Sequence, residues 1–409
     1  MYIKRTVEKQ ILTLSEKFPV VLVTGARQVG KSTMLNHIKE PNRKYVSLDD
    51  LAARSLAIED PKLFLETYSY PIIIDEIQRV PSLFIAIKQV VDELALSGKP
   101  NKGLYWLTGS QQFSMMKNVS DSLVGRVAIV NMASLSQNEI LQRESEIFSL
   151  DLMKLKERSE KYESSGVEDV YKMIFNGGMP ALVNKDKFSR EQYFKEYVNT
   201  YLVRDVRDFT RVGDLMTFQL FLEYIAARTA MPIVYSTAAK ELGVSTPTIK
   251  SWTSILEALG VIYLLYPYHS NITKRLVKAP KVYFLDTGLC SYLTRWPSAE
   301  VLQKGAMSGA ILETFVVSEI VKNYYNFGKR FDFFYYRDFD QKEIDLVFTD
   351  AISITPVEIK KNINPLHADK HFSVLNKFNL NINPGIILSL AKDFMPLNRN
   401  TYICPISII

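Results

Sequence analysis

The chain has 409 residues, of which 47% are hydrophobic and 23% charged, a composition ordinary for a globular protein and long enough for several domains. Its formal net charge of +6 permits contact with a polyanion but does not require it. The two cysteines, Cys290 and Cys404, disfavour a disulfide framework and favour a reducing, cytoplasmic location. The amino-terminal residues lack the apolar core of a secretory signal, and apolar runs such as VIYLLYPY are too short to span a bilayer, so no membrane association is expected.

The order of hydrophobic patterns predicts an α/β protein. Between residues 19 and 132, short β-branched runs alternate with helical patterns, which is typical of a parallel sheet covered on both faces. The pattern then becomes helical, passes through a helix-turn-helix-like segment, and ends in a long helix followed by aromatic-rich strands. We therefore predict four domains, over residues 1–133, 134–230, 231–285 and 286–409.

The sequence GARQVGKST has the pattern and context of a phosphate-binding loop, because it follows an apolar strand and precedes a helix. Glycines let backbone N–H groups turn toward phosphates, and the new helix adds its positive end. We expect Lys31 to reach the β- and γ-phosphates of ATP, Ser32 to hold Mg²⁺, and Thr33 to touch the α-phosphate. The predicted nucleotide contacts in this loop are Gly25, Ala26, Arg27, Gln28, Val29, Gly30, Lys31, Ser32 and Thr33.

Two further strand ends carry polar groups suited to nucleotide hydrolysis. The apolar strand in PIIIDEIQ ends in Asp75, predicted to complete the Mg²⁺ shell, and Glu76, predicted to orient or deprotonate the attacking water. LYWLTGSQQ places Ser110 and Gln111 where a γ-phosphate sensor would lie, although polar residues end many strands.

Two arginines are candidates for stabilising charge in the transition state, as arginine fingers do. They are Arg126 in SLVGRVAIV and Arg204 in YLVRDVRDF. A structural ion pair is the alternative for both, and it is favoured for Arg204 because Asp205 and Asp208 are close in sequence. A finger that acts on a neighbouring subunit would need a homo-oligomer, which the sequence leaves open.

The segment YSTAAKELGVSTPTIKSW has the spacing of a helix-turn-helix, with Ala239 at the helix contact, Gly243 in the turn and Ile249 in the core. The strand that follows would enter a wing, so this part is predicted to be a winged helix. Its predicted DNA contacts are Thr246, Thr248 and Lys250 in the second helix, and Lys274, Arg275, Lys278 and Lys281 in a basic loop. The alternative is a winged helix that serves only as a structural joint or as a protein-docking surface.

The stretch EIDLVFTDAISITPVEIKK predicts two adjacent strands that carry a charged cluster. Glu358 and Lys360 point to one face, and Asp345 can meet them from the partner strand. Two carboxylates that bind Mg²⁺ beside a lysine suit metal-assisted hydrolysis of a phosphodiester, with Glu313 as a fourth group. Glu343 leaves open which acid faces inward, and a cross-strand ion pair without catalysis is the alternative interpretation.

The motifs GARQVGKST, IIIDEIQ, LTGSQ and LVGRV together resemble the prokaryotic AAA-type ATPases of the P-loop class. GGMP, YLVRDV and KVYFLDTGL resemble one subgroup, whose members pair this ATPase with a carboxy-terminal domain of unknown function that resembles restriction endonucleases. The resemblance covers nearly the whole chain. It implies a P-loop ATPase core, a helical lid, ATP and Mg²⁺ as cofactors, and a carboxy-terminal centre in which Asp345, Glu358 and Lys360 match the Asp…Glu-x-Lys pattern.

Two main hypotheses of function follow, beside a third possibility of a purely protein-directed ATPase. In the first, an ATPase acts on DNA, with Lys31 and Glu76 hydrolysing ATP and Asp345, Glu358 and Lys360 cutting nucleic acid. In the second, ATP occupancy switches the positions of the lid and winged helix, and the carboxy-terminal domain only docks DNA or protein.

Overall fold

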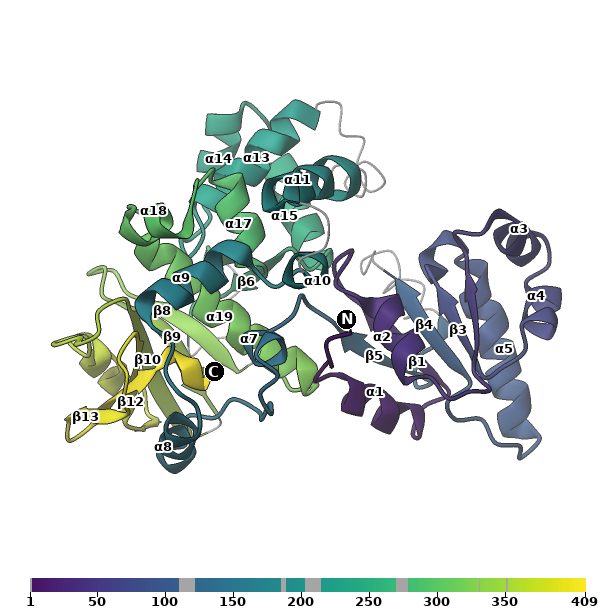
Figure 1. Ribbon diagram of the computed structural model, residues 1–409, viewed down its shortest axis with the longest axis horizontal. Helices are drawn as coiled ribbons and strands as arrows, with labels where there is room; N and C mark the ends of the chain where they lie inside the picture. The colour runs from purple at the N-terminus through teal and green to yellow at the C-terminus, as the bar shows by residue number, and fades with distance from the viewer. Residues whose placement is uncertain are drawn as a thin grey trace.

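The computed structural model describes residues 2–109, 122–184, 189–202, 215–269, 279–330, 332–350 and 352–409. The amino-terminal domain forms one lobe, at the right of Figure 1. A group of helices and, below it, a second sheet that holds the carboxyl terminus form the rest of the molecule (Figure 1). The two sheets therefore lie in different parts of the molecule.

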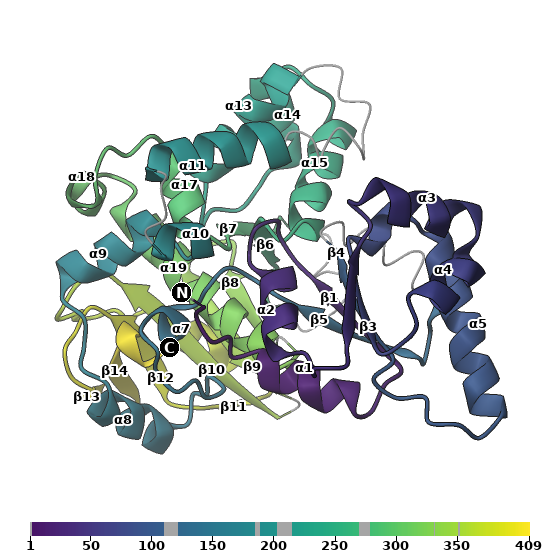
Figure 2. The same cartoon turned by 45° about the vertical axis from the view of Figure 1, so that its right-hand side comes forward.

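The amino-terminal lobe is a five-stranded parallel sheet with helices on both faces, as predicted from the alternating patterns (Figure 2). The strand order is β2-β3-β4-β1-β5. The strands are β1 (Val20–Thr24), β2 (Lys44–Ser47), β3 (Ile72–Asp75), β4 (Tyr105–Gly109) and β5 (Val127–Asn131). The helices are α1 (Glu8–Ser15), α2 (Lys31–Ile38), α3 (Leu51–Glu59), α4 (Pro61–Thr67), the short 3₁₀ turn η1 (Ile77–Arg79) and α5 (Ser82–Leu96).

Strand β1 shows why this sheet needs cover on both sides. All five of its residues are buried, and successive side chains point to opposite faces. Val21 and Val23 pack in the cluster that contains α1 and α2, whereas Val20 and Leu22 pack in the cluster that contains α3, α4 and α5. The loop after β1 emerges where the parallel strands end, with β4 on one side of it and β5 on the other.

The middle of the chain is helical. Its elements are α7 (Gln137–Ile140), α8 (Leu152–Lys161), α9 (Val167–Asn176), α10 (Pro180–Val183), α11 (Arg190–Glu196), the π-helical turn η2 (Tyr197–Leu202) and α13 (Leu215–Ala227). A helix-turn-helix follows, made of α14 (Tyr235–Leu242) and α15 (Thr246–Ala258), and then an antiparallel pair, β6 (Ile262–Leu265) and β7 (Lys281–Phe284). Gly243 ends α14 with a φ of 68°, and Ile249 is fully buried, as the spacing predicted.

The carboxy-terminal part begins with α17 (Thr287–Leu293), α18 (Ala299–Lys304) and α19 (Ser308–Asn326). Its mixed sheet has the order β13-β14-β12-β10-β9-β8, with β11 beside β10. The strands are β8 (Phe333–Arg337), β9 (Glu343–Thr349), β10 (Ser353–Lys360), β11 (Asn381–Ile382), β12 (Gly385–Ser389), β13 (Met395–Asn398) and β14 (Thr401–Pro405), with 3₁₀ turns η3 (Phe372–Lys377) and η4 (Ile406–Ile408). β9 and β10 are antiparallel neighbours, as the pattern of the charged stretch predicted.

One hydrophobic cluster runs through all of these parts, from Val21 in β1 to Cys404 in β14, whereas the face of the amino-terminal sheet that α3, α4 and α5 cover has a cluster of its own. Helices α17 and α18 pack against α9. The sequences GGMP and LDTGL meet where Asp286 accepts a hydrogen bond from the Gly178 backbone N–H at 2.9 Å. A Cβ on Gly177 would come within 2.3 Å of the Asp286 carboxylate, so only glycine fits that contact.

Candidate functional site

The phosphate-binding loop has the backbone that its glycines were predicted to provide. Gly25 has a φ of 140°, and a Cβ there would lie 1.9 Å from the carbonyl oxygen of Met132. Gly30 has a φ of 94° and precedes the first residue of α2. Lys31 is buried, and its Nζ donates to the carbonyl oxygens of Gly25 at 3.0 Å and Ala26 at 2.8 Å. The Lys31 ammonium is therefore held by carbonyl groups of the same loop in which phosphates are expected to bind.

Three hydroxyl groups converge on Asp75 at the end of β3. Ser32 Oγ donates to its carboxylate at 2.7 Å, Tyr45 Oη donates at 2.8 Å, and Thr108 Oγ1 also donates. Strand β4 lies between β1 and β3, so Thr108 bridges the gap between the loop and the acid. The side-chain oxygens of Ser32 and Asp75 are suitable ligands for Mg²⁺, because this ion prefers carboxylate and hydroxyl oxygens together with phosphates.

Glu76 follows in the left-handed conformation, with a φ of 57°. Its backbone N–H donates to Thr108 Oγ1 at 3.2 Å, and the Gln78 amide donates to its carboxylate. This conformation is uncommon for a residue other than glycine and holds the carboxylate beside the phosphate-binding loop. Sequence reasoning missed Tyr45, Gln78 and Thr108; only Thr108 had a signal, as a polar residue near a strand end.

A cavity of about 1000 Å³ opens over the loop. One wall carries loop residues from Arg27 to Thr33 and Glu76, and the opposite wall carries residues of α10, α11 and η2. Tyr193, Tyr197 and Tyr201 belong to that wall, and the Arg27 guanidinium lies 5.7 Å from the centre of the Tyr201 ring. The volume is at the upper end of the range usual for small-ligand sites.

Arg126 lies away from this cavity within its own chain. It precedes β5, and the register Val20↔Val127 places it at the edge where the strands begin, about 15 Å of strand from the phosphate-binding loop. Its Nε pairs with Asp92 at 2.5 Å, and its Nη1 donates to the Val124 carbonyl. Arg126 therefore does not line the cavity of its own chain, and the prediction that it contacts the nucleotide of that chain is wrong. Ser110, Gln111 and Arg204 lie outside the described residues.

The second helix of the helix-turn-helix presents part of its first half to solvent. Lys250 is exposed, with its Nζ 5.7 Å from the centre of the Tyr235 ring, whereas Thr246 is half-buried. Thr248 shares a 2.8 Å hydrogen bond with Ser245, which caps the helix. Lys274, Arg275 and Lys278 lie outside the described residues.

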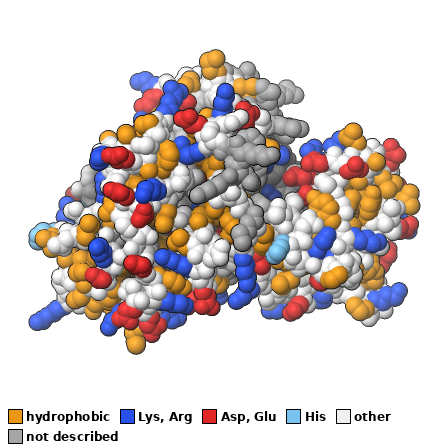
Figure 3. Space-filling model, viewed as in Figure 1, with side chains coloured by type: hydrophobic (Ala, Val, Ile, Leu, Met, Phe, Trp, Pro, Cys, Tyr) orange, Lys and Arg blue, Asp and Glu red, His pale blue; other side chains and the backbone are white. Residues whose placement is uncertain are grey.

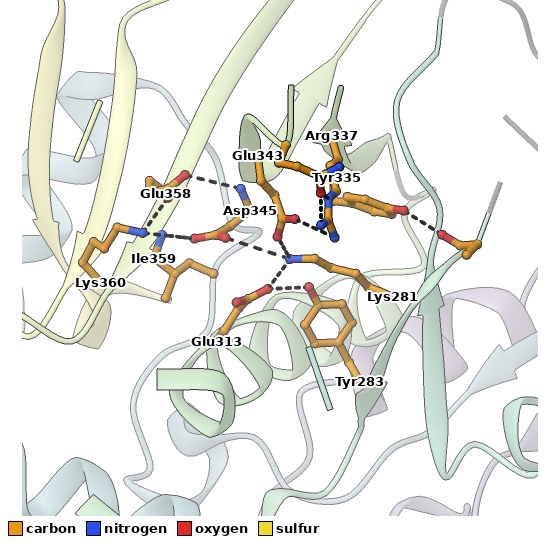
Figure 4. Close-up of polar contacts among 12 residues, drawn as sticks. Lys281, Tyr283, Glu313, Tyr335, Arg337, Glu343, Asp345, Glu358, Ile359 and Lys360 are labelled. Carbon is orange, nitrogen blue, oxygen red and sulfur yellow. Dashed lines mark hydrogen bonds and ion pairs between the residues drawn. The ribbon is translucent and has the colours of Figure 1, made fainter. Parts of the chain in front are cut away.

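Strands β9 and β10 bring the predicted charged triad together (Figure 4). Lys360 Nζ lies 2.5 Å from Glu358 Oε1 and 3.9 Å from Asp345 Oδ2. The backbone pairing between the strands ends at Leu346↔Val357, and beyond it the Ile359 N–H donates to Asp345 Oδ2 at 2.8 Å. Asp345 is thus the acid directed at Glu358 and Lys360.

Glu343 points elsewhere on the same side of β9. Its carboxylate pairs with Lys281 at 2.7 Å and with Arg337 at 3.6 Å. Glu313 of α19 pairs with Lys281 at 3.0 Å and accepts a hydrogen bond from the Tyr283 hydroxyl at 2.7 Å.

Lys281 was expected in a basic DNA-contacting loop, and this expectation is wrong. It is the first residue of β7, its side chain is 1% exposed, and its ammonium lies among Glu313, Glu343 and Asp345, 4.0 Å from the last (Figure 4). Burial alone would lower the pKa of Lys281, but the surrounding acidic groups raise it well above its ordinary value. The side chain is therefore a charged ammonium.

Two buried acidic groups of this centre, Glu358 and Glu313, have pKa values above the ordinary range. Burial, with a contribution from the charge of Asp345, raises the pKa of Glu358 to about 8. Burial also raises the pKa of Glu313 to about 7, against the opposing effect of Lys281. The site therefore carries less negative charge near neutral pH than its four carboxyl groups suggest.

This arrangement does not fit the divalent metal predicted for Asp345 and Glu358. Among the described residues, no group of three or more Asp, Glu, His or Cys side chains is placed to hold a metal ion. A buried ammonium that the prediction did not include, that of Lys281, lies 4.0 Å from Asp345 and pairs with Glu313 at 3.0 Å. No chemical step is therefore assigned to a metal at this centre.

Comparison with known proteins identifies the amino-terminal domain. Residues 17–141 match the family model of the AAA domain. Residues 167–300 and 308–409 match models of two domains of unknown function, DUF8612 and DUF4143. Together with the loop and acid pair, the first match makes residues 17–141 an AAA-type ATPase domain and supports ATP binding and hydrolysis.

Curated relatives are distant. Uncharacterized proteins of Mycobacterium bovis and Mycobacterium tuberculosis are each 26% identical over 74% of this chain, which spans only 62% of their length. An uncharacterized protein of Methanocaldococcus jannaschii is 24% identical, over 77% of this chain and 70% of its own. A solved Walker-type ATPase of Pyrococcus abyssi is 14% identical with a TM-score of 0.43, and the match covers 70% of this chain and 94% of that one. Across the described part of the chain, no helix is both long and apolar enough to cross a membrane.

Proposed function

We propose that the protein is an ATP-hydrolysing switch, in which the nucleotide is held between the phosphate-binding loop and the helical segment of α10, α11 and η2. The observation that carries this proposal is the shared cavity, whose two walls belong to these two parts. A ligand that contacts both walls favours the arrangement in which both are in place, so nucleotide binding and release change their relative stability.

The residues divide the work of hydrolysis among them. Lys31 exchanges its contacts with the loop carbonyls for the phosphate oxygens. Ser32 and Asp75 would hold Mg²⁺, which neutralises phosphate charge when bound. Glu76 orients the attacking water and accepts its proton.

Two substitutions test these roles. Lys31→Ala is expected to lose most ATP affinity because the phosphates lose their buried cation, whereas Lys62→Ala, at an exposed lysine of α4, is expected to bind normally. Glu76→Gln is expected to bind ATP and to turn it over at least ~100-fold more slowly, with exposed Glu66→Gln as its control. Unchanged ATP binding by Lys31→Ala, or turnover by Glu76→Gln at the rate of the unsubstituted protein, would contradict the assignment.

For the target of the switch we propose DNA, bound in part by the winged helix. The support is the exposed start of α15 with Lys250 and the modest positive charge of the chain. On the face shown in Figure 3, basic and acidic side chains are interspersed, so binding would depend on a local contact rather than on a broad basic surface. Lys250→Ala should weaken DNA binding and make it less sensitive to salt, whereas Lys240→Ala, at an exposed lysine of the first helix, should not. DNA binding of equal strength in both variants would argue for a protein target instead.

For the carboxy-terminal domain we propose docking rather than cleavage, because its acidic centre does not fit a metal. Supercoiled, linear and single-stranded DNA should remain intact with Mg²⁺ or Mn²⁺, with and without ATP. Cleavage that Glu358→Ala abolishes would replace this role with that of a nuclease.

A further inference from the structure

The acidic centre of the carboxy-terminal domain contains a cation supplied by another part of the chain. Glu313 comes from α19, and Glu343 and Asp345 come from β9. The ammonium between them belongs to Lys281 on β7, which pairs with β6 rather than with the carboxy-terminal sheet. Figure 4 shows the lysine side chain entering the centre from that strand.

This lysine is held in place from both ends of its side chain. Its backbone pairs with Leu265 of β6 and forms a bridge to Pro232. Its ammonium lies 2.7 Å from Glu343 and 3.0 Å from Glu313, and only 1% of the side chain is exposed. Tyr283, two residues along the same face of β7, donates to the same Glu313 oxygen. The side chain of Lys360, in contrast, is 38% exposed.

Every acidic side chain of the cluster already has a basic partner. Its four acidic side chains are Glu313, Glu343, Asp345 and Glu358, and its three basic ones are Lys281, Lys360 and Arg337. A buried ammonium without these partners would be strongly unfavourable, and so would the buried carboxylates without it. A divalent ion at the same position would add two positive charges beside one that cannot leave.

We propose that Lys281 is the resident cation of the acidic centre: its ammonium lies among Glu313, Glu343 and Asp345, where a divalent ion bound to Asp345 would find its further carboxylate ligands, and it keeps this centre free of metal. The proposal deepens the docking role proposed for the carboxy-terminal domain and rests on it. Lys281 also ties β7 to α19 and β9, so that the antiparallel pair β6–β7 and the carboxy-terminal sheet form one unit.

The test is Mn²⁺ binding by the full chain without nucleotide, followed by electron paramagnetic resonance. The unsubstituted protein and Asp345→Asn should bind Mn²⁺ equally, because the centre contributes no site. Lys281→Ala should gain one Mn²⁺ site, with an affinity at least tenfold higher than any Mn²⁺ binding at this centre in the unsubstituted protein. This gain should disappear when Lys281→Ala is combined with Asp345→Asn. Lys281→Arg, which keeps the charge, should gain no site.

Two results would overturn the proposal: loss of a Mn²⁺ site in Asp345→Asn alone, or a folded Lys281→Ala that gains none. Mn²⁺ should also raise the melting temperature of Lys281→Ala but not that of the unsubstituted protein. If Lys281→Ala fails to fold, Lys281→Met keeps the side-chain volume. If neither folds, the comparison with Asp345→Asn decides, since equal binding supports the proposal. Mn²⁺ binding at this centre by the unsubstituted protein, without DNA cleavage, would refute Lys281 as resident cation and leave the docking role intact. DNA cleavage that Glu358→Ala abolishes would refute the docking role.

Discussion

The chemistry of the ATPase domain depends on how Asp75 is held. Its carboxylate accepts hydrogen bonds from three hydroxyls on three different elements, and the one from Tyr45 was not foreseen. Burial and the neighbouring Asp75 carboxylate raise the pKa of the Tyr45 hydroxyl, so it remains a donor at all physiological pH values. Tyr45 therefore positions a predicted Mg²⁺ ligand without contacting nucleotide in this arrangement.

We expect Tyr45→Phe to lower ATP turnover about tenfold or less and to raise the Mg²⁺ concentration needed for half-maximal rate. The loss of one hydrogen bond to a charged group costs on the order of 1.5–3 kcal/mol where it is fully felt, and two other donors to Asp75 remain. Steady-state kinetics over a range of Mg²⁺ concentrations measures both effects. Tyr70→Phe, before the start of β3, is the control. An unchanged Mg²⁺ dependence would remove Tyr45 from the site.

The raised pKa of Glu358 predicts that stability depends on pH. Its folded value of about 8 exceeds the ordinary value of 4.5, so the folded state keeps a proton that the unfolded state releases. The stabilisation is complete below about pH 4.5 and is lost as the pH rises toward 8, with a slope of at most about 1.4 kcal/mol per pH unit for this one group. Glu313 acts in the same direction up to about pH 7.

Melting temperatures measured from pH 5 to 8 should therefore fall, and Glu358→Gln should make the fall shallower. Glu66→Gln, at an exposed site, should leave the slope unchanged. A steeper fall in Glu358→Gln than in the unsubstituted protein would contradict the raised pKa.

At the scale of elements, the turn between α15 and β6 links the helix-turn-helix to the phosphate-binding loop. Gly260 has a φ of 68°, and a Cβ there would lie 3.4 Å from the backbone nitrogen of Ala26. Gly243 has the same φ, but a Cβ at that position would have nothing within 4 Å. Replacing either glycine by alanine therefore strains the backbone equally, but only the replacement at Gly260 adds a contact with the phosphate-binding loop.

Gly260→Ala should weaken ATP binding several-fold relative to Gly243→Ala. Both variants should lose about 1 kcal/mol of stability, because alanine is strained at this φ. Isothermal titration with ATP and a thermal melt separate the two effects. Equal ATP affinity in the two variants would show that the turn does not influence the loop.

The elements themselves could largely be predicted from the sequence. The parallel sheet followed from β-branched runs between helices, and the helix-turn-helix followed from Gly243 and Ile249. The convergence of Asp345, Glu358 and Lys360 followed from the two-residue period of strands. The role of Lys281 could not be predicted, because it depends on packing between β7 and α19, a helix that begins well beyond this strand in the chain, and no local pattern reports such a contact. The place of Arg126, in contrast, could have been predicted, because it precedes the apolar run of β5 and therefore lies where the parallel strands begin, whereas the phosphate-binding loop follows the end of β1.

At the scale of the whole molecule, the short pair β6–β7 lies between the phosphate-binding loop and the acidic centre. The turn before Ile262 lies against the phosphate-binding loop, and Ile262 pairs with Phe284 at that end. At the other end Leu265 pairs with Lys281, whose side chain enters the acidic centre. Three residues of strand, about 10 Å, separate these ends. The phosphate-binding loop and the carboxy-terminal domain are thus connected through one short, packed pair of strands.

The central claim is that nucleotide binding stabilises the helical segment of α10, α11 and η2 and the α15–β6 turn, as well as the loop that binds the phosphates. Hydrogen–deuterium exchange of the full chain, with and without Mg²⁺ and a non-hydrolysable ATP analogue, tests this claim most directly. We predict slower exchange at residues 25–33 together with residues 192–201 and 260–265. Protection confined to residues 25–33 would contradict the account, because ATP would then bind without engaging the parts that it is proposed to switch.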